Sequence, residues 1–168
     1  MTERHKPSRL GPLLGTLLFL VIAPGVVDGV LPWWITGWRG EAGWALRFTG
    51  AALILPGLYV LLESFFRFAL QGFGTPAPVF PTKRLVRGGY YHYVRNPMYV
   101  ANVAIISGQV LWFHSGPLLA YAIGIWIAFH LFVLACEEPK LRTTYGREYD
   151  DFCAQVPRWI PRLKAPAS

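Results

Sequence analysis

Charged residues are scarce in this chain of 168 residues. Asp, Glu, Lys and Arg make up 15% of the sequence, against about 25% in a typical soluble protein. Hydrophobic residues make up 54%, which argues against an intrinsically disordered chain and against a nucleic-acid-binding protein whose basic residues coat a soluble core. The apolar residues are grouped in blocks rather than spread at amphipathic spacing, so we expect an integral membrane protein.

Cysteine is nearly absent, and the sequence has no internal repeat and no low-complexity tract. The two cysteines, Cys136 and Cys153, form neither a metal-binding spacing nor a disulfide framework. Both fall at or beyond the expected cytoplasmic end of a membrane span, where thiols stay reduced. We therefore expect no metal, and interpret the two residues as a small apolar filler and a surface thiol.

Four apolar stretches predict four membrane-spanning helices, at about residues 10–27, 48–66, 97–113 and 118–136. The first includes a run of 18 residues without a charge, long enough for a membrane helix. The last two lie within the 41 residues 96–136, which contain no Asp, Glu, Lys or Arg. A single helix of that length would be ~60 Å long, about twice the hydrocarbon thickness of a membrane. We therefore expect a helical hairpin turning at residues 114–117, in an all-α polytopic membrane protein with one domain, 1–168.

Lys and Arg are divided unequally between the two expected sides of the membrane. The N-terminus, residues 67–95 and the segment after Cys136 hold 14 of them, against Arg39 and Arg47 in the first outer loop and none in the second. By the positive-inside rule both termini face the cytoplasm, in the inner membrane if the cell is bacterial. The net charge of +7 is then explained by topology and by contact with anionic lipid rather than by nucleic-acid binding.

The two cytoplasmic segments, 67–96 and 137–168, are where we expect the chemistry, because a protein that only fills membrane does not need them. Asn96 is a suitable N-cap and Pro97 a suitable first helical residue, so a helix should begin there. Arg95 lies beside that helix start, where the positive end of the helix dipole disfavours a cation unless an anion is also present. The sequence therefore predicts a site for a carboxylate or phosphate.

A second candidate site is Glu137-Glu138, directly after an apolar run. Two carboxylates at the negative end of a helix are unfavourable, so either the helix continues into the cytosol or the pair binds a cation; a solvated membrane boundary is the simpler alternative. His130 lies on the same helical face, seven residues before Glu137, and is either a further site residue or a partner for a neighbouring helix. Gly72 and Gly74 would let the backbone approach a ligand, or would form a hinge; prolines follow them, so they are not a dinucleotide fingerprint.

Two motifs resemble those of the integral-membrane methyltransferases, which include the isoprenylcysteine carboxyl methyltransferases and the phospholipid N-methyltransferases. The motifs are Gly-x-Tyr-x-Tyr-x-Arg-Asn-Pro-Met-Tyr at residues 89–99 and Glu-Glu-x-x-Leu-x-x-x-Tyr-Gly-x-x-Tyr at residues 137–149. The resemblance extends over about residues 72–161. It implies S-adenosylmethionine as the methyl donor, bound at the cytoplasmic face between the last spans and the C-terminal segment.

The resemblance also implies roles for individual residues. Gly72 and Gly74 match a Gly-x-Gly that contacts the cofactor in the phospholipid branch. Glu137 and Glu138 match the Glu-Glu motif of that branch. The residues expected to bind the cofactor are Gly72, Gly74, Tyr90, Asn96, Glu137 and Glu138, and those expected to take part in catalysis are Arg95, Tyr99 and Glu138.

The prenylcysteine branch has an Arg-His-Pro-x-Tyr segment, which Arg95, Asn96 and Tyr99 resemble, with Asn96 in place of His. Asn can still donate a hydrogen bond to the methionine carboxylate of the cofactor. That branch also has an arginine just before a Val-Pro near the C-terminus, thought to hold the substrate carboxylate. Gln155 stands in this place here, with Arg158 nearby. The residues expected to bind the substrate are Gln155, Arg158 and His130.

The expected activity is methyl transfer from S-adenosylmethionine to an apolar or lipid-like acceptor, of the isoprenylcysteine carboxylate or phospholipid amine class. A small thiol or an isoprenoid is also compatible with the sequence. Two alternatives stay open: a membrane interaction subunit without catalytic activity, and a membrane oxidoreductase related to the sterol reductases, whose C-terminal half is distantly similar. The expected partner is the methyl acceptor in the membrane, with no nucleic acid and no metal.

Overall fold

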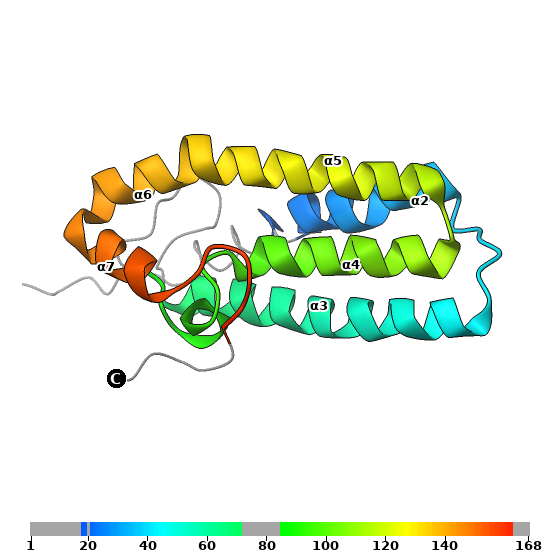
Figure 1. Cartoon of the computed structure of the whole chain (residues 1–168), viewed down its shortest axis with the longest axis horizontal. Helices are drawn as coiled ribbons and strands as arrows, with labels where there is room; N and C mark the ends of the chain where they lie inside the picture. The colour runs from blue at the N-terminus through cyan, green and yellow to red at the C-terminus, as the bar shows by residue number, and fades with distance from the viewer. Residues whose placement is uncertain (1–17, 20, 72–84, 163–168) are drawn as a thin grey trace, which may run out of the picture.

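The computed structural model describes residues 18–19, 21–71 and 85–162, and within these ranges every regular element is a helix (Figure 1). In chain order the elements are the π-helical segment η1 (Gly25–Val30), α2 (Leu31–Thr36), α3 (Trp44–Gln71), the 3₁₀ turn η2 (Gly89–His92), α4 (Pro97–Phe113), α5 (Gly116–Phe132), the π-helical segment η3 (Val133–Glu137), α6 (Glu138–Tyr145) and α7 (Arg147–Gln155). The predicted all-α class is confirmed for this part of the chain.

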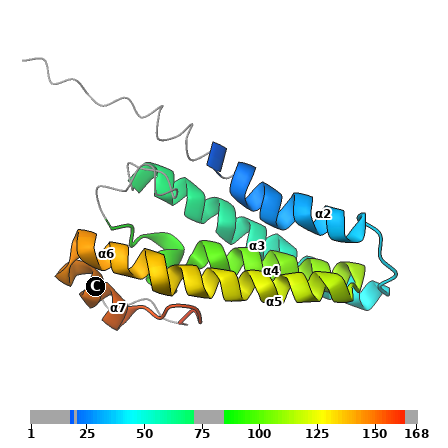
Figure 2. The same ribbon diagram turned by 90° about the horizontal axis from the view of Figure 1, so that it is seen from above.

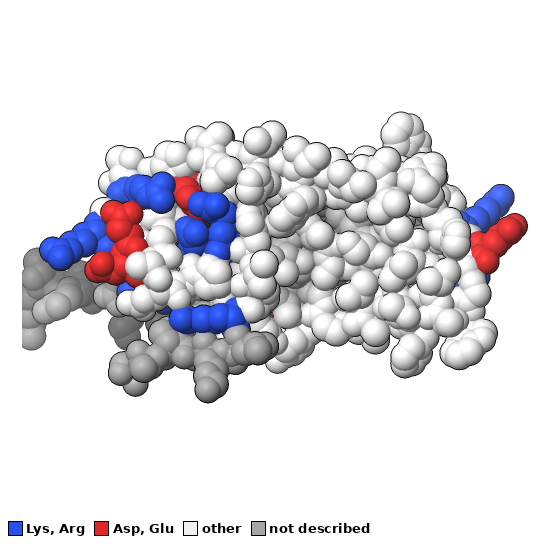
Figure 3. Space-filling view, in the orientation of Figure 1, with Lys and Arg blue, Asp and Glu red and all other residues white. Residues whose placement is uncertain are grey.

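The long helices lie side by side along one axis (Figures 1 and 2). The last described residues gather with α6 and α7 at the end of the bundle where α4 begins (Figure 1). Charged residues occupy both ends of the face drawn in Figure 3, with a wide uncharged belt between them. Two helices, Trp44–Arg67 and Gly116–Tyr145, are long and apolar enough to cross a membrane, and two shorter apolar helices, Val21–Thr36 and Pro97–Phe113, accompany them.

The hairpin between α4 and α5 turns where the sequence predicts a turn. α4 begins at Pro97, directly after Asn96. His114 ends it in a left-handed backbone conformation, with a φ of 50°. Ser115 then caps α5, because its side-chain oxygen accepts a hydrogen bond of 3.3 Å from the backbone N–H of Leu118.

Glycines bring α3 and α4 into close contact. A Cβ atom at Gly50 would lie 2.5 Å from the carbonyl oxygen of Gly108, and one at Gly108 would lie 2.6 Å from that of Gly50. Farther along α3, Gly57 faces Ile105 and Ala101 in the same way. Small residues let the backbones of membrane helices approach closely, so these glycines set the distance between α3 and α4.

The N-terminal helix continues beyond the end that the sequence predicts. The predicted segment ends at residue 27, but the helix runs through Asp28 to Thr36; residues 10–17 and 20 lie outside the described residues. The helix contains η1, which comes directly before Leu31 and Pro32. Pro32 has no N–H to offer the carbonyl groups one turn earlier, and π-helical spacing is a local adjustment that helices make at such points. The acidic residue in this apolar run therefore does not mark a helix end.

Two side chains donate hydrogen bonds to backbone carbonyls about one turn before Pro32. The hydroxyl of Tyr121 in α5 donates to the carbonyl of Val27 at 2.8 Å, and Nε2 of Gln109 in α4 donates to the carbonyl of Asp28 at 2.6 Å. A free backbone carbonyl is costly in an apolar environment. These two bonds therefore tie the N-terminal helix to the α4–α5 hairpin.

The elements α5, η3 and α6 form one continuous helix of 30 residues, Gly116–Tyr145. The predicted apolar span stops at residue 136, but Glu137 and Glu138 do not end the helix. Here too a π-helical segment comes just before a proline, Pro139. At 1.5 Å per residue the helix is ~45 Å long, against ~30 Å of membrane hydrocarbon. Its last turns, which carry charged residues, therefore extend beyond the apolar belt. The helix thus continues past the Glu pair, which is one of the alternatives that the sequence left open.

The helix α7 covers the segment that leads into α4. Its buried residues Tyr149 and Phe152, followed by Val156, pack against Val86 and Tyr91. This cluster fixes the chain just before η2 and α4. It thereby positions the residues of the first candidate site.

Candidate functional site

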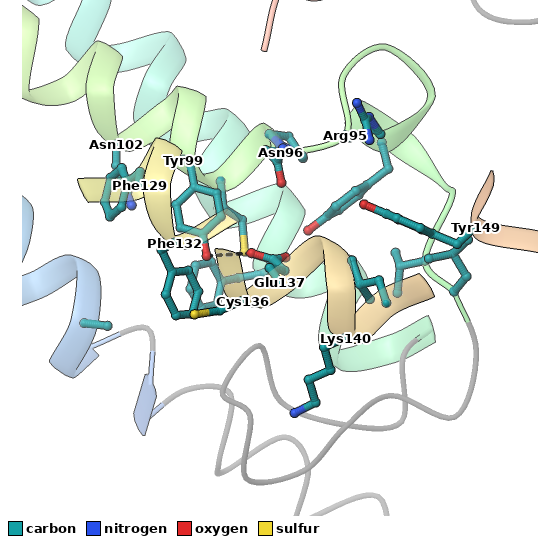
Figure 4. A pocket seen from close by; sticks show the side chains of 18 of the residues that line it. Arg95, Asn96, Tyr99, Asn102, Phe129, Phe132, Cys136, Glu137, Lys140 and Tyr149 are labelled. Atoms are coloured by element: carbon teal, nitrogen blue, oxygen red, sulfur yellow. Dashed lines mark hydrogen bonds between the residues drawn. The ribbon is translucent and has the colours of Figure 1, made fainter. Parts of the chain in front are cut away.

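A cavity of about 430 Å³ lies between the start of α4, the end of α5 and α6 (Figure 4). Its volume is within the range of about 300–1,000 Å³ that is usual for small-molecule sites. Its polar lining includes Arg95, Asn96, Tyr99, Asn102, Glu137 and Lys140, and its apolar lining includes Phe19, Ala23, Pro24, Val27, Phe65, Phe129 and Phe132. The cavity thus joins a charged end of the molecule to the interior of the apolar helices.

Glu137 lines the cavity. It accepts a hydrogen bond of 2.9 Å from the hydroxyl of Tyr99 (Figure 4), and no Lys or Arg in the described part of the chain forms an ion pair with it. The ring of Tyr99 packs against Phe129, with ring centroids 4.8 Å apart. Asn102 lines the same wall, and its Oδ1 is buried with no partner among the described residues. The carboxylate of Glu137 and the Oδ1 of Asn102 can both accept hydrogen bonds from a ligand.

Glu138 does not line the cavity, is 3% exposed, and binds three guanidinium groups that we call the arginine cluster: Arg95, Arg142 and Arg158. Arg158 donates a hydrogen bond to each carboxylate oxygen of Glu138, from Nε to Oε1 at 2.6 Å and from Nη2 to Oε2 at 3.1 Å. Arg95 Nη1 donates to Oε1 at 3.1 Å, and Arg142 Nη2 lies 3.7 Å from Oε2. Burial alone would raise the pKa of Glu138, but the hydrogen bond from Arg158 and the charges of the cluster outweigh burial, so its pKa is lowered.

Arg95 connects the arginine cluster to the cavity. Its Nη1 also donates to the sulfur of Cys153 at 2.8 Å, and its backbone N–H donates to the carbonyl of Pro157 at 2.9 Å. Its Nε is buried with no partner in the described ranges. Arg95 and Arg158 share the carboxylate of Glu138, so positive charge is in excess beside the cavity. An anionic group bound there would compensate it.

Asn96 stands at the predicted N-cap position, but its side chain does not cap the helix. Its Nδ2 donates instead to the carbonyl of Arg158 at 3.2 Å. The residue is 9% exposed. The start of the helix is therefore as predicted, whereas the side-chain bond joins α4 to the C-terminal segment.

Residues 157–162, which we call the C-terminal strap, hold the loop before α4 against α5. Trp159 Nε1 donates to Nδ1 of His130 at 3.0 Å. The ring of Trp159 also lies edge-on to Trp126, with centroids 4.7 Å apart. At the other end of the strap, the backbone N–H of Arg162 donates to the carbonyl of Tyr93 at 3.1 Å. The strap therefore bridges two elements that are distant in sequence.

The structure brings some of the predicted site residues to the cavity and leaves others away from it. Those that line it are Arg95, Asn96, Tyr99 and Glu137. Others make contacts elsewhere. Glu138 and Arg158 bind each other in the arginine cluster, and His130 accepts a hydrogen bond from Trp159. The ring of Tyr90 lies edge-on to Tyr59, with centroids 6.3 Å apart, and the carbonyl of Gln155 accepts a hydrogen bond from Arg162. Gly72 and Gly74 lie outside the described residues.

Sequence reasoning missed Asn102 and most of the apolar lining. Asn102 follows Tyr99 by three residues in a charge-free run, so its position on the same helical face was a usable signal. Phe19 and Pro24 gave none, because their place depends on how the N-terminal helix packs. Within the ranges described, no group of three or more His, Cys, Asp or Glu side chains could hold a metal ion.

The fold and the site together define an all-helical membrane protein with a cavity between its charged end and its apolar helices. The chain belongs to the phospholipid methyltransferase family, whose model matches residues 45–148, more than half of the sequence. This confirms the resemblance to the integral-membrane methyltransferases. The matched residues include α3 from its second residue onward, the hairpin and both glutamates, and they end before the C-terminal strap. No curated protein matches the chain.

Proposed function

We propose that this protein transfers a methyl group from S-adenosylmethionine to an apolar or lipid-like acceptor at the cytoplasmic face of a membrane. The observation that carries the proposal is the cavity, which joins polar groups at the helix ends to an apolar interior. One ligand of the reaction is charged and water-soluble, and the other is apolar. A single cavity with these two ends can bring them together.

The residues around Arg95 fit the methionine part of the donor. When bound, S-adenosylmethionine supplies a methyl group on a positively charged sulfur. Its carboxylate would bind Arg95, whose Nε is buried and unpartnered in the described part of the chain, and Asn96. The excess positive charge around Glu138 supports this assignment, because an anion there compensates it.

Glu137 and Tyr99 would serve a different part of the ligands. A carboxylate held against the sulfonium would stabilise the ground state more than the transition state, because the sulfur loses its charge during transfer. We therefore assign Glu137 to the ribose or amino group of the donor, or to the acceptor. If the acceptor is an amine, Glu137 is the cavity carboxylate that could take up its proton. The hydrogen bond from Tyr99 holds it in place.

The acceptor would occupy the apolar end of the cavity. Phe19 precedes the N-terminal helix Val21–Thr36, Phe65 belongs to α3, and Phe129 and Phe132 belong to α5. An acceptor with a hydrocarbon tail could enter between these helices from the bilayer. The prenylcysteine and phospholipid classes both fit this description. A dry apolar wall also keeps water away from the reacting atoms.

The proposed topology has four spans, with both termini in the cytoplasm. The charged end of the molecule, with α6, α7 and the strap, then faces the cytoplasm, and the uncharged belt of Figure 3 lies in the membrane. Cysteine labelling in intact cells tests this topology. A cysteine at Glu41 should react with an impermeant maleimide added outside, whereas one at Arg147 should not. The reverse pattern would overturn the orientation.

The experiment that tests the activity is transfer of label from methyl-labelled S-adenosylmethionine to a native lipid extract by the purified protein. Wild type should label an extractable acceptor, and mass spectrometry identifies it. Glu137→Gln should reduce labelling strongly, whereas Glu41→Gln, in the loop between α2 and α3, is the matched control and should not. Absence of labelled product from wild type, with lipid present in excess, would overturn the proposed activity.

A further inference from the structure

We infer that Arg158 is a positioning residue that fixes, through Glu138, the guanidinium of Arg95 for the carboxylate of the donor. The inference rests on the proposed function. It concerns a part of the chain, the C-terminal strap, that lies beyond the residues matched by the family model. It gives Arg158 a role other than contact with the substrate.

Arg158 and Arg95 share the carboxylate of Glu138. Arg158 binds Glu138 with two hydrogen bonds, Nε to Oε1 at 2.6 Å and Nη2 to Oε2 at 3.1 Å. A two-point contact of this kind fixes the carboxylate plane as well as its position. Arg95 Nη1 donates at 3.1 Å to the same Oε1. The orientation that Arg158 imposes on Glu138 is therefore passed on to Arg95.

The strap also fixes the backbone around Arg95. The carbonyl of Pro157 accepts the backbone N–H of Arg95 at 2.9 Å, and the carbonyl of Arg158 accepts the side chain of Asn96 at 3.2 Å. Farther along the strap, Arg162 donates to the carbonyl of Tyr93 at 3.1 Å. The two residues assigned to the donor carboxylate are thus held on one side by strap groups.

The ion pair of Glu138 and Arg95 is largely buried. Glu138 is 3% exposed, and the side chain of Arg95 is 10% exposed. Removing Arg158 leaves the buried carboxylate to Arg95 and to the half-exposed Arg142, 3.7 Å away. Arg95 would then be drawn into a closer pair with Glu138, and less of its charge would face the cavity. Affinity for the ligand carboxylate should fall.

The test compares two probes on the purified full chain in detergent, by isothermal calorimetry. S-adenosylhomocysteine carries the amino-acid carboxylate, and methylthioadenosine lacks it. Arg158→Ala should weaken binding of S-adenosylhomocysteine about 10- to 100-fold, the size expected for hydrogen bonds to a charged group, and change binding of methylthioadenosine less than about twofold. Arg95→Ala should give the same contrast, and the double variant should lose little more than either single one.

Two further variants keep the test decisive. Arg158→Lys keeps the charge but not the two-point contact, so it should lose an intermediate part of the affinity for S-adenosylhomocysteine. It replaces Arg158→Ala in the test if that variant does not fold. Arg147→Ala, at an exposed arginine of α7 outside the arginine cluster, is the matched control, with a loss below about twofold. Equal weakening of both probes by Arg158→Ala and Arg158→Lys, or no weakening by either, would overturn the positioning role. If the wild type bound neither probe, the proposed function itself would be overturned.

Discussion

The hydroxyl of Tyr99 donates a hydrogen bond of 2.9 Å to Oε2 of Glu137, which joins the first turn of α4 to the last residue of η3. The two residues are 38 positions apart in the chain. Glu137 is thereby held by a neutral donor, whereas Glu138 beside it is held by arginines. Two adjacent glutamates of one helix thus point in different directions and meet different partners.

Tyr99→Phe should weaken the proposed reaction without breaking the fold. Phe keeps the ring contact with Phe129 but removes one hydrogen bond to a charged group, worth about 1.5–3 kcal/mol. We expect the rate of label transfer to fall roughly 10- to 100-fold, with a smaller effect on thermal unfolding. Tyr59→Phe is the control, because Tyr59 is 64% exposed, and it should match wild type. A full rate in Tyr99→Phe would contradict the role given to the Tyr99–Glu137 pair.

Gly108→Ala should destabilise the protein, whereas Gly124→Ala should not. A Cβ at Gly108 would lie 2.6 Å from the carbonyl of Gly50 and 2.7 Å from Ile54, whereas one at Gly124 would have nothing within 4 Å. Overpacking of this kind costs about 1–3 kcal/mol, whereas Ala in an open helical position gains up to ~1 kcal/mol. Unfolding in detergent measures both. Equal stability of the two variants would show that α3 and α4 are not in backbone contact.

The stabilising effect of Tyr121 should depend on Pro32. Tyr121→Phe removes the donor to the carbonyl of Val27 and should cost about 0.6–1.7 kcal/mol, the range of interhelical hydrogen bonds in membranes. In a Pro32→Ala background the helix can return to α spacing, so that the N–H of Leu31, which now bonds Val26, reaches Val27. Tyr121→Phe should then cost less. A double-mutant cycle of unfolding free energies measures this coupling, and strict additivity would contradict it.

Acid should weaken the docking of the strap through Glu138. Because the pKa of Glu138 is lowered in the folded protein, its ionised form stabilises the fold fully at pH values above the ordinary pKa of 4.5. That contribution is lost as the pH falls through the folded pKa. We expect stability to change little with pH near neutrality and to decline in acid, and Glu138→Gln to lower stability at neutral pH and flatten the acid decline. Thermal unfolding across pH measures this; an unchanged acid slope in Glu138→Gln would be the contrary result.

The sequence predicted the hairpin well because its signals are local. A long run without charge must fold back, and Asn96 followed by Pro97 marks where a helix begins. The continuation to Tyr145 is only one of the alternatives that the sequence allows, because Glu138 is charged and resembles a solvated membrane boundary. It is stabilised instead by Arg95 and other arginines that only the folded chain brings near.

The candidate site was predictable in part for a similar reason. Arg95 and Glu137 stand out in sequence because their charges oppose the helix dipole or interrupt an apolar run. Asn102 and Phe129 do not, because a polar or aromatic residue inside a span is usually explained by packing. That Glu138 lies outside the cavity lining and Glu137 within it depends on the rotation of one helix, and sequence spacing alone does not fix that rotation.

On the proposed function, the cavity beside Arg95 binds S-adenosylmethionine and its demethylated thioether product, S-adenosylhomocysteine. Calorimetric titration of the purified wild-type chain with S-adenosylhomocysteine tests it most directly, with Arg95→Ala and Arg39→Ala in parallel. We predict saturable binding at one site per chain by wild type and Arg39→Ala, with markedly weaker binding by Arg95→Ala. No binding heat from folded wild type at ligand concentrations up to about 1 mM, the upper end of usual substrate constants, would contradict the account.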